Sequence, residues 1–274
     1  MLLKPYLKYI IYKLHLAGWL DVLLYRISKL RNRKINQLYK QKYPDIVLPA
    51  DYALYETYQL KYQKFIEDGA LAAKEITAWT KPYISSNAPC LLDWGCGAGR
   101  ILRHLPALQP AAILYGCDIN EEIIAWNKAN YHNICFTATH HFTPMPYAPI
   151  FFDLVYGMSI FTHMEATQQE NWIIELHRIL KTTGVLLITT QGTHYHNKLL
   201  QGEMKMLTDK GVYTQTYSKP GHRMMSTYHN SCHFTKLIES YFTILEYYDG
   251  AIHPGKAGGQ DLWILQKRGN NNFE

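Results

Sequence analysis

Residues 90–100 read Cys90-Leu91-Leu92-Asp93-Trp94-Gly95-Cys96-Gly97-Ala98-Gly99-Arg100. The stretch begins as an apolar run, meets one acid and then alternates glycine with other residues. Glycine allows a sharp turn and a close approach of the backbone to a ligand. A helix that follows such a turn presents unpaired N–H groups and a positive dipole end. The segment therefore predicts a nucleotide or nucleoside site at the end of a buried strand.

The spacing of the glycines separates the ligand classes. A dinucleotide fingerprint, Gly-x-Gly-x-x-Gly, needs a third glycine at position 100, where this chain has Arg100. A P-loop needs Gly-Lys-Ser/Thr, which does not follow. The pattern Gly-x-Gly-x-Gly with Asp93 two residues before the first glycine favours a nucleoside.

A second acid stands one strand-helix-strand step later. The apolar run Tyr115-Gly116-Cys117 ends in Asp118, which lies 25 residues after Asp93. A carboxylate at that place can accept hydrogen bonds from both ribose hydroxyls, which fits an unphosphorylated ribose. Strand, spaced glycines, helix and acid-ending strand together are far more specific than a glycine-rich turn alone.

From residue 87 onward, short apolar runs alternate with helical segments, which predicts βα units and a mostly parallel sheet. Helices are expected near 99–105, 121–130 and 168–180. Strands are expected near 89–93, 112–117, 133–137, 152–157, 184–190, 242–248 and 261–267. Because the last two strands are separated by a Gly/Pro-rich stretch, 250–259, without a helical run, they should form an antiparallel hairpin.

Over about residues 85–268 the chain resembles a class I S-adenosylmethionine-dependent methyltransferase. Four stretches carry the resemblance, namely 91–100, 116–119, 152–157 (Phe-Asp-Leu-Val-Tyr-Gly) and 176–187 (Leu-His-Arg-Ile-Leu-Lys-Thr-Thr-Gly-Val-Leu-Leu). The resemblance implies an α/β fold with a Rossmann-like seven-stranded sheet whose last strand is antiparallel. It also implies an enzyme with S-adenosyl-L-methionine as cofactor.

The resemblance further implies roles for single residues. The loop residues Gly95, Cys96, Gly97 and Gly99 would approach the methionine part through the backbone, and Asp93 would orient its amino group. Asp118 would hold the ribose, and Ile119 would pack on the adenine. Where the family often reads the adenine amine with an acid or amide, this chain has 137–141, which leaves His141 as the candidate. The expected cofactor site is completed, at the end of the fourth strand, by Gly157 and Met158.

The class of methyl acceptor is inferred by analogy with similar enzymes. The stretches 159–164 and 259–263 resemble a subset of these enzymes that act on small molecules, often sugar-related. A hydroxyl acceptor benefits from a general base, and His163 is the candidate, with a purely structural histidine as the alternative. We expect a small-molecule hydroxyl, in a saccharide or lipid-linked precursor. RNA or tRNA methylation and a non-catalytic nucleoside-binding scaffold stay open as alternatives.

The N-terminal part, residues 1–84, has a different character. Residues 1–42 contain ten Lys or Arg and one acid, Asp21, for a formal +9, so the other 232 residues sum to −3 within a whole-chain charge of +6. Apolar residues recur with helical spacing over Tyr6–Leu14, a second apolar stretch covers Leu20–Leu30, and 51–79 is helical with an interruption at Gly69. Its apolar runs are shorter than a membrane span requires.

This basic arm has two readings. We expect it either to form a helical lid packed over the cofactor site or to form a helix that lies on an anionic membrane surface. Nucleic acid is a disfavoured partner, because 156–159 (Tyr-Gly-Met-Ser) lacks the Asn/Asp-Pro-Pro-aromatic pattern of amino-methylating relatives. The expected location is cytoplasmic, with peripheral attachment to a membrane under the second reading.

Metal binding is not expected. The five cysteines are scattered without a Cys-x-x-Cys pair, which disfavours a zinc site and a disulfide framework. His194 and His196 follow the fifth strand, but no nearby carboxylate or cysteine completes a ligand set. The predicted organisation is a helical arm (1–84), a methyltransferase domain (85–268) and a frayed tail (269–274).

Overall fold

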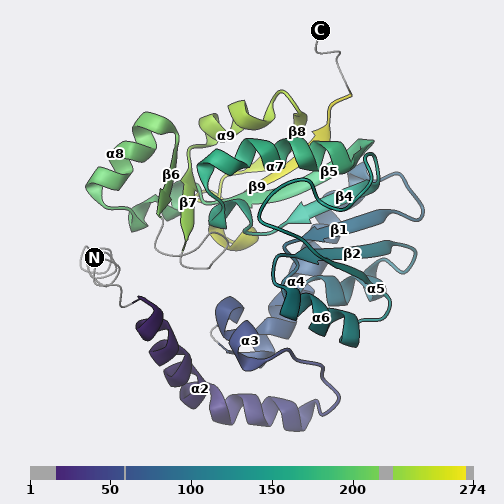
Figure 1. The fold of residues 1–274 in the computed structure, drawn as a ribbon, viewed down its shortest axis with the longest axis vertical. Coiled ribbons are helices and arrows are strands. Elements are labelled where there is room, and N and C mark those ends of the chain that lie inside the picture. The colour runs from purple at the N-terminus through teal and green to yellow at the C-terminus, as the bar shows by residue number, and fades with distance from the viewer. Residues whose placement is uncertain (1–16, 59, 216–224, 270–274) are drawn as a thin grey trace.

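The computed structural model describes residues 17–58, 60–215 and 225–269. Its centre is a seven-stranded sheet in the order β3-β2-β1-β4-β5-β9-β8 (Figure 1). The strands of this sheet are β1 (Cys90–Trp94), β2 (Ile113–Asp118), β3 (Cys135–Ala138), β4 (Phe152–Gly157), β5 (Leu180–Thr190), β8 (Phe242–Tyr248) and β9 (Asp261–Lys267). All seven overlap the strands predicted from the sequence.

The first five strands of the sheet pair in parallel, whereas β9 pairs antiparallel with both β5 and β8. The predicted fold class, a Rossmann-like sheet with an antiparallel last strand, is confirmed. The strand order reverses direction on either side of β1, since β2 lies on one side and β4 on the other. In open α/β sheets ligands bind outside the carboxyl ends of the strands at such a switch point.

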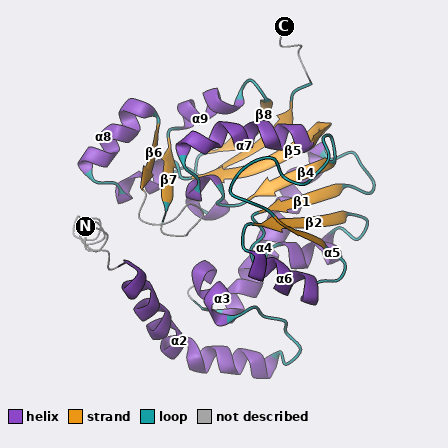
Figure 2. Cartoon of the chain, viewed as in Figure 1, coloured by secondary structure: helices purple, strands orange, loops and turns teal. Residues whose placement is uncertain are grey.

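Helices cover both faces of the sheet, as Figure 2 shows, which is why its central strands are apolar at successive positions. Neighbouring leucines of β1 illustrate this arrangement. Leu92 packs with α7 (Ala166–Ile179) and α9 (Ser231–Ile238) on one face. Leu91 packs on the other face with α4 (Tyr62–Thr80), α5 (Leu105–Leu108) and α6 (Glu121–Asn130).

The N-terminal region consists of α2 (Ala17–Lys42), α3 (Asp51–Tyr58) and α4, followed by the 3₁₀ turn η1 (Lys81–Tyr83). The helix α2 contains the predicted apolar stretch Leu20–Leu30, whereas the predicted stripe Tyr6–Leu14 lies outside the described residues, as does most of the predicted tail. Figure 1 shows α3 between α2 and the sheet. Of the predicted arm, α3 and α4 therefore lie nearest the sheet.

The expected interruption at Gly69 is wrong, because the two helices of this segment separate before Tyr62 and Gly69 lies inside α4. Glycine serves close packing there. A Cβ atom on Gly69 would lie 2.3 Å from the carbonyl oxygen of Arg100, in the glycine-rich segment. The helix α4 thus rests directly on the backbone that follows β1.

The expected helix 99–105 is also different in the structure. Its place is taken by a 3₁₀ turn, η2 (Leu102–His104), and the four-residue helix α5. Pro106 stands in the first turn of α5. Since proline has no N–H to donate and its ring clashes with the preceding turn, a continuous helix cannot run through this position.

Four elements between 199 and 240 were not predicted. These are α8 (Gln201–Lys210), the strands β6 (Val212–Gln215) and β7 (Ser226–His229), and α9. The two strands form a separate antiparallel pair. A bridge between Gln191 and Tyr228 connects this pair to the end of β5, so it extends the carboxyl edge of the main sheet. Two further 3₁₀ turns, η4 (Thr193–Lys198) and η5 (Ala257–Gly259), lie near the same edge.

We expect Gly69→Ala to lower the free energy of unfolding by about 1–3 kcal/mol, because the added methyl group meets a backbone oxygen that cannot rotate away. Urea denaturation followed by circular dichroism measures this change. The matched control is Gly202→Ala in α8, where a Cβ atom meets nothing within 4 Å. That variant should be unchanged or more stable by up to about 1 kcal/mol. Equal stability of Gly69→Ala and the wild type would contradict the close packing.

Candidate functional site

Two cavities meet at the carboxyl ends of β1, β2 and β4. The larger, of about 540 Å³, is bordered by the glycine-rich loop, by α3 and α4 and by residues 255–258. The smaller, of about 150 Å³, is bordered by Asp118, by the segment after β4 and by α7. Gly95 and Ser159 border both cavities, so the two adjoin at these residues. They lie where the strand order reverses.

The glycine-rich loop is tied to the end of β2 by its backbone. The amides of Gly95 and Cys96 donate to the Cys117 carbonyl oxygen at 2.8 and 2.9 Å. Asn127 of α6 donates from Nδ2 to the Gly97 carbonyl oxygen at 2.7 Å. Gly97 has φ +50°, and a Cβ atom on it would meet nothing within 4 Å. The loop therefore leaves open space above a positive-φ glycine, which fits a ligand that approaches the backbone closely.

Asp118 accepts two hydrogen bonds from backbone amides. Its Oδ2 accepts from Gly97 N at 2.8 Å, and its Oδ1 accepts from Asn120 N at 2.9 Å. Asn120 in turn caps α6, since its side-chain oxygen accepts from the Ile123 amide. Burial raises the pKa of Asp118, while the amides of Asn120 and Gly97 oppose this. Each carboxylate oxygen has further lone pairs available for hydroxyl donors.

Asp93 is buried at the end of β1, with 3% of its surface exposed. Burial raises its pKa from 3.8 to about 7, against the opposing effects of the Tyr156 hydroxyl and the Arg100 guanidinium. Both Asp93 and Arg100 border the larger cavity. This cavity thus has an acid that titrates near neutrality and a cation on the same side.

His163 ends the 3₁₀ turn η3 (Phe161–His163) and borders the smaller cavity. Its Nδ1 lies 2.7 Å from the Met225 carbonyl oxygen. Because a carbonyl only accepts, Nδ1 carries the proton of this hydrogen bond. In the neutral ring Nε2 is then the unprotonated nitrogen, which is the protonation state that a general base requires. His141 and Ile119 border the same cavity.

Ser159 is fixed between three strands of the sheet. It follows β4 with φ +64°, an uncommon conformation for a residue with a side chain. Its amide donates to the Thr189 hydroxyl of β5 at 2.8 Å, and its Oγ lies 2.7 Å from Nε2 of Gln260, next to β9. The two stretches that resemble the small-molecule subset, 159–164 and 259–263, therefore touch at the rim of the site.

Nine of the eleven predicted site residues border the two cavities. Asp118, Ile119, His141 and His163 border the smaller one, Gly95 borders both, and the larger one adds Asp93, Cys96, Gly97 and Met158. Gly99 and Gly157 border neither. A Cβ atom on Gly99 would meet the Tyr131 ring at 3.0 Å, and one on Gly157 would meet Trp94 at 2.7 Å. These two glycines permit packing behind the cavities.

Several bordering residues were not predicted. Trp94, Gln168 and Trp172 border the smaller cavity, and Thr57 and Phe65 the larger one. Glu56 of α3 borders neither cavity, but burial and the charge of Asp118 raise its pKa. The residues from α3, α4 and α7 reach the site only through tertiary packing. The glycine pattern and the strand ends contain no signal for them.

Three histidines that border neither cavity are used in packing. His194 lies over Gly259, and His196 Nε2 lies 3.1 Å from the His229 carbonyl oxygen. His229 is 1% exposed and pairs with Gln169, and burial lowers its pKa to about 3. Over residues 17–58, 60–215 and 225–269, no group of three or more His, Cys, Asp or Glu side chains is arranged to hold a metal ion.

Comparison with known families gives the deciding observation. Residues 92–188, from β1 to β5, match the family model of the methyltransferase domain. This chain carries a class I S-adenosylmethionine-dependent methyltransferase domain. The match confirms the enzyme class and the cofactor implied by the sequence resemblance, and it covers the strand ends that form both cavities.

Solved structures share the fold of this methyltransferase. DesVI from Streptomyces venezuelae aligns over 80% of this chain and 99% of its own, with 14% identity and a TM-score of 0.55. A methyltransferase from Methanosarcina mazei aligns over 69% and 97%, with 16% identity and a TM-score of 0.53. The Burkholderia thailandensis 1,6-didemethyltoxoflavin-N1-methyltransferase aligns over 82% and 93%, with 15% identity and a TM-score of 0.52. At these identities the likeness shows the fold alone.

No helix within the described part of this methyltransferase combines the length and the apolar character that crossing a membrane requires.

The pKa of Asp93 predicts a pH-dependent stability. Because the folded-state pKa of about 7 lies above the ordinary value of 3.8, the protonated carboxyl contributes fully below about pH 4. That contribution is lost as the pH rises through about 7. We expect Asp93→Asn, which mimics the neutral acid, to remove a decline on the order of 4 kcal/mol between these pH values.

Urea denaturation of the ligand-free protein from pH 4 to pH 8 measures this effect. Glu170→Gln, at an exposed position of α7, is the matched control and should keep the wild-type pH profile. If wild type and Asp93→Asn have parallel profiles, Asp93 does not titrate in this range.

Proposed function

We propose that this protein transfers a methyl group from S-adenosyl-L-methionine to a hydroxyl of a small molecule, in a saccharide or lipid-linked precursor. The observation that carries the hydroxyl acceptor is the arrangement of His163. Its ring is held by the Met225 carbonyl in the tautomer of a base, in a cavity that also contains Asp118. A neutral hydroxyl is a poor nucleophile, so a base in this position has a chemical purpose.

The residues of the two cavities fit the cofactor. When bound, S-adenosyl-L-methionine would supply an electrophilic methyl group on a sulfonium, whose carbon–sulfur bond breaks in an in-line displacement to give a neutral thioether. Asp118 has lone pairs for the two ribose hydroxyls while it keeps its bonds to Gly97 and Asn120. Ile119, 38% exposed beside Asp118, offers an apolar surface for the adenine, and His141 lies at the same end.

The larger cavity fits the amino-acid part of the cofactor. An amino acid at neutral pH has an ammonium and a carboxylate, and the cavity offers Asp93 for the first and Arg100 for the second. The ammonium would favour ionised Asp93 and so lower its raised pKa. Open space over Gly97 lets the ligand contact the loop backbone.

His163 would accept the proton of the acceptor hydroxyl on Nε2 as the methyl group is transferred. Alignment of the acceptor and exclusion of water supply the rest of the rate enhancement in such a displacement. The Burkholderia relative acts on a small molecule, as its name says, and holds S-adenosylhomocysteine. Its 15% identity supports the shared fold, whereas the acceptor proposed here depends on His163 and its cavity.

The assignment of Asp118 to the ribose predicts a selective loss of affinity. We expect Asp118→Asn to weaken S-adenosylhomocysteine binding on the order of 100-fold, because a charged hydrogen-bond acceptor is lost. Isothermal titration calorimetry with S-adenosylhomocysteine and with its 2′-deoxy analogue measures the effect. The wild type should discriminate strongly between the two ligands, and Asp118→Asn should discriminate little.

Asp153→Asn is the control, since this acid pairs with Lys181 and borders neither cavity. It should keep the wild-type preference for the ribose hydroxyl. An Asp118→Asn protein that binds more weakly but discriminates as the wild type does would mean that Asp118 only supports the loop.

The acceptor is tested by a screen for S-adenosylhomocysteine formation with pooled glycans, small phenols, lipid-linked saccharides and RNA, followed by mass spectrometry of the product. We expect a methylated hydroxyl. With that acceptor, His163→Gln should lower kcat on the order of 100-fold or more and remove the acidic limb of the pH–kcat profile. His194→Gln, outside both cavities, should leave the profile unchanged.

The outcomes separate the alternatives. Methylated RNA would replace the small-molecule proposal. Cofactor binding without turnover of any pool would support the non-catalytic scaffold. An unchanged pH profile in His163→Gln would remove this residue as the base while leaving the cofactor assignment intact.

A further inference from the structure

The long helix α2 is attached to the body of the protein through a polar and aromatic face. Asp21 accepts hydrogen bonds from the hydroxyls of Tyr52 and Tyr55, at 2.9 and 3.3 Å. Asn36 donates to the Leu60 carbonyl oxygen at 2.9 Å and accepts from the Tyr62 amide at 3.2 Å. A helix on a globular protein normally turns its apolar face inward. In α2 the inward face instead carries Asp21 and Asn36, which we call the polar anchors.

Over residues 19–30 the outward face of α2 is apolar, whereas Lys34, Gln37 and Gln41 lie on the same side farther along the helix. Large apolar side chains are exposed along its length, and we call the following five the apolar stripe: Trp19 (80% exposed), Leu23 (53%), Ile27 (49%), Leu30 (72%) and Leu38 (55%). With about 100° between successive residues, they fall within an arc of roughly 100°. The anchors Asp21 and Asn36 lie on the opposite side of the helix by the same geometry.

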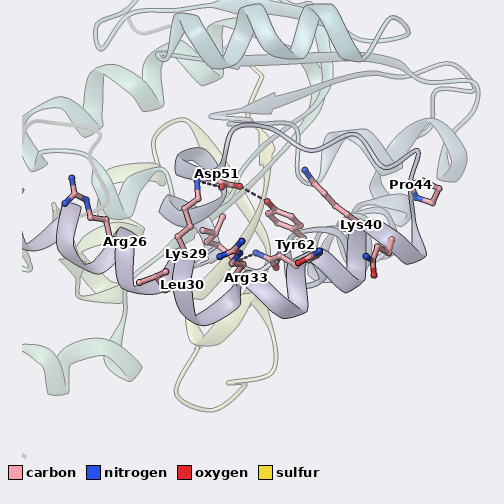
Figure 3. A pocket seen from close by; sticks show the side chains of 12 residues that line it. Arg26, Lys29, Leu30, Arg33, Lys40, Pro44, Asp51 and Tyr62 are labelled. Atoms are coloured by element: carbon pink, nitrogen blue, oxygen red, sulfur yellow. Dashed lines mark hydrogen bonds and ion pairs between the residues drawn. The ribbon is translucent and has the colours of Figure 1, made fainter.

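A basic groove runs beside the apolar stripe. It is a cavity of about 920 Å³ between α2 and the start of α3. Among its described bordering residues are four cations, Arg26, Lys29, Arg33 and Lys40, and one carboxylate, Asp51, which gives a net charge of +3. Figure 3 shows the cations projecting from one side of α2.

Asp51 is already engaged within the groove. Lys29 Nζ lies 3.0 Å from its Oδ2, and the Tyr62 hydroxyl donates to its Oδ1 at 2.6 Å (Figure 3). Burial raises the pKa of Asp51, but the hydrogen bonds from Tyr62 and Lys29 outweigh burial, and the pKa lies below its ordinary value. Asp51 is therefore ionised at neutral pH and offsets one cation. The groove keeps an excess of positive charge for an anionic ligand.

We propose that α2 docks the protein on an anionic phospholipid bilayer, with the apolar stripe at the level of the headgroups and the basic groove on lipid phosphates. The charge of the groove complements phosphate, and the adjacent stripe has apolar surface to bury. Nucleic acid would use the cations but would leave these aliphatic side chains in water. Because the apolar stripe and the basic groove lie on neighbouring sides of one helix, an anionic bilayer is the partner that can contact both.

The docked helix lies close to the methyl-transfer site. Asp51, at the first residue of α3, borders the groove, and Thr57, near its end, borders the larger cavity beside the glycine-rich loop. The eight residues of α3 span about 12 Å. Attachment through α2 thus holds the catalytic opening within about one short helix of the headgroup layer.

The test is co-sedimentation of the full chain with vesicles of phosphatidylcholine alone and of phosphatidylcholine with 30% phosphatidylglycerol. We expect binding to the anionic vesicles that falls with added salt, and little binding to the neutral ones. Arg26→Ala/Arg33→Ala should reduce the partition coefficient about 20-fold or more, at about fivefold for each cation. Leu23→Gln/Leu30→Gln should reduce it on the order of tenfold or more.

Each double variant has a matched control. Lys205→Ala/Lys210→Ala removes the same charge from the exposed surface of α8, and Ile174→Gln/Ile252→Gln replaces exposed apolar residues elsewhere. Both controls should partition as the wild type does. Calorimetry with S-adenosylhomocysteine accompanies every variant, so a fold defect or a failure of the methyltransferase assignment is seen separately from a loss of vesicle binding.

Four results would overturn the proposal. Equal sedimentation with both kinds of vesicle, or controls that lose as much binding as the α2 variants, would remove the role of α2. Analytical ultracentrifugation that shows self-association abolished by Leu23→Gln/Leu30→Gln would assign the stripe to a second copy of this chain. Binding of a mixed-sequence RNA, lost in Arg26→Ala/Arg33→Ala without vesicle binding in the wild type, would assign the groove to nucleic acid.

Discussion

The carboxylate of Asp118 connects the parts of the proposed cofactor site. One oxygen accepts from Gly97 in the loop after β1, and the other accepts from Asn120 at the start of α6. Through these two bonds the end of one strand fixes the loop of its neighbour and the beginning of a helix. Asn127, farther along the same helix, returns to the loop at the Gly97 carbonyl. The glycine-rich loop, the end of β2 and α6 are therefore joined in a closed ring of hydrogen bonds, and the shape of this ring depends on the side chain that is also the proposed ribose ligand.

The sequence was sufficient for the sheet and for the inner residues of the site. Buried parallel strands are short and apolar, and the two acids stand at strand ends, so Asp93 and Asp118 could be placed without coordinates. Helix boundaries were harder to predict from the sequence where tertiary packing outweighs local helix preference, as at Gly69, or where one residue interrupts a helical pattern, as at Pro106. Thr57 and Trp172 border the cavities because helices fold over them, and no local pattern contains that information. The strands β6 (Val212–Gln215) and β7 (Ser226–His229) were missed because neither contains the apolar run by which the other strands were predicted.

The positive charge of the chain is concentrated on α2. The helix α2 has seven Lys or Arg and one acid, a formal +6, which equals the net charge of the whole protein. The two hypotheses for the N-terminal region, a lid over the site and a membrane-surface helix, apply to different helices. Residues of α3 and α4 border the larger cavity, as a lid does, while α2 borders neither cavity of the site and turns its apolar stripe outward. The proposed docking through α2 is therefore compatible with the packing of α3 and α4 beside the larger cavity.

The contact at Gly69 has a mechanical consequence. Where helices usually meet a loop, side chains form a deformable layer that absorbs small shifts. Here the helix backbone lies directly on the carbonyl of Arg100, with no such layer between them. A displacement of α4 is therefore transmitted directly to the segment after β1, so the rigidity of that segment depends on a helix that lies outside the matched residues 92–188.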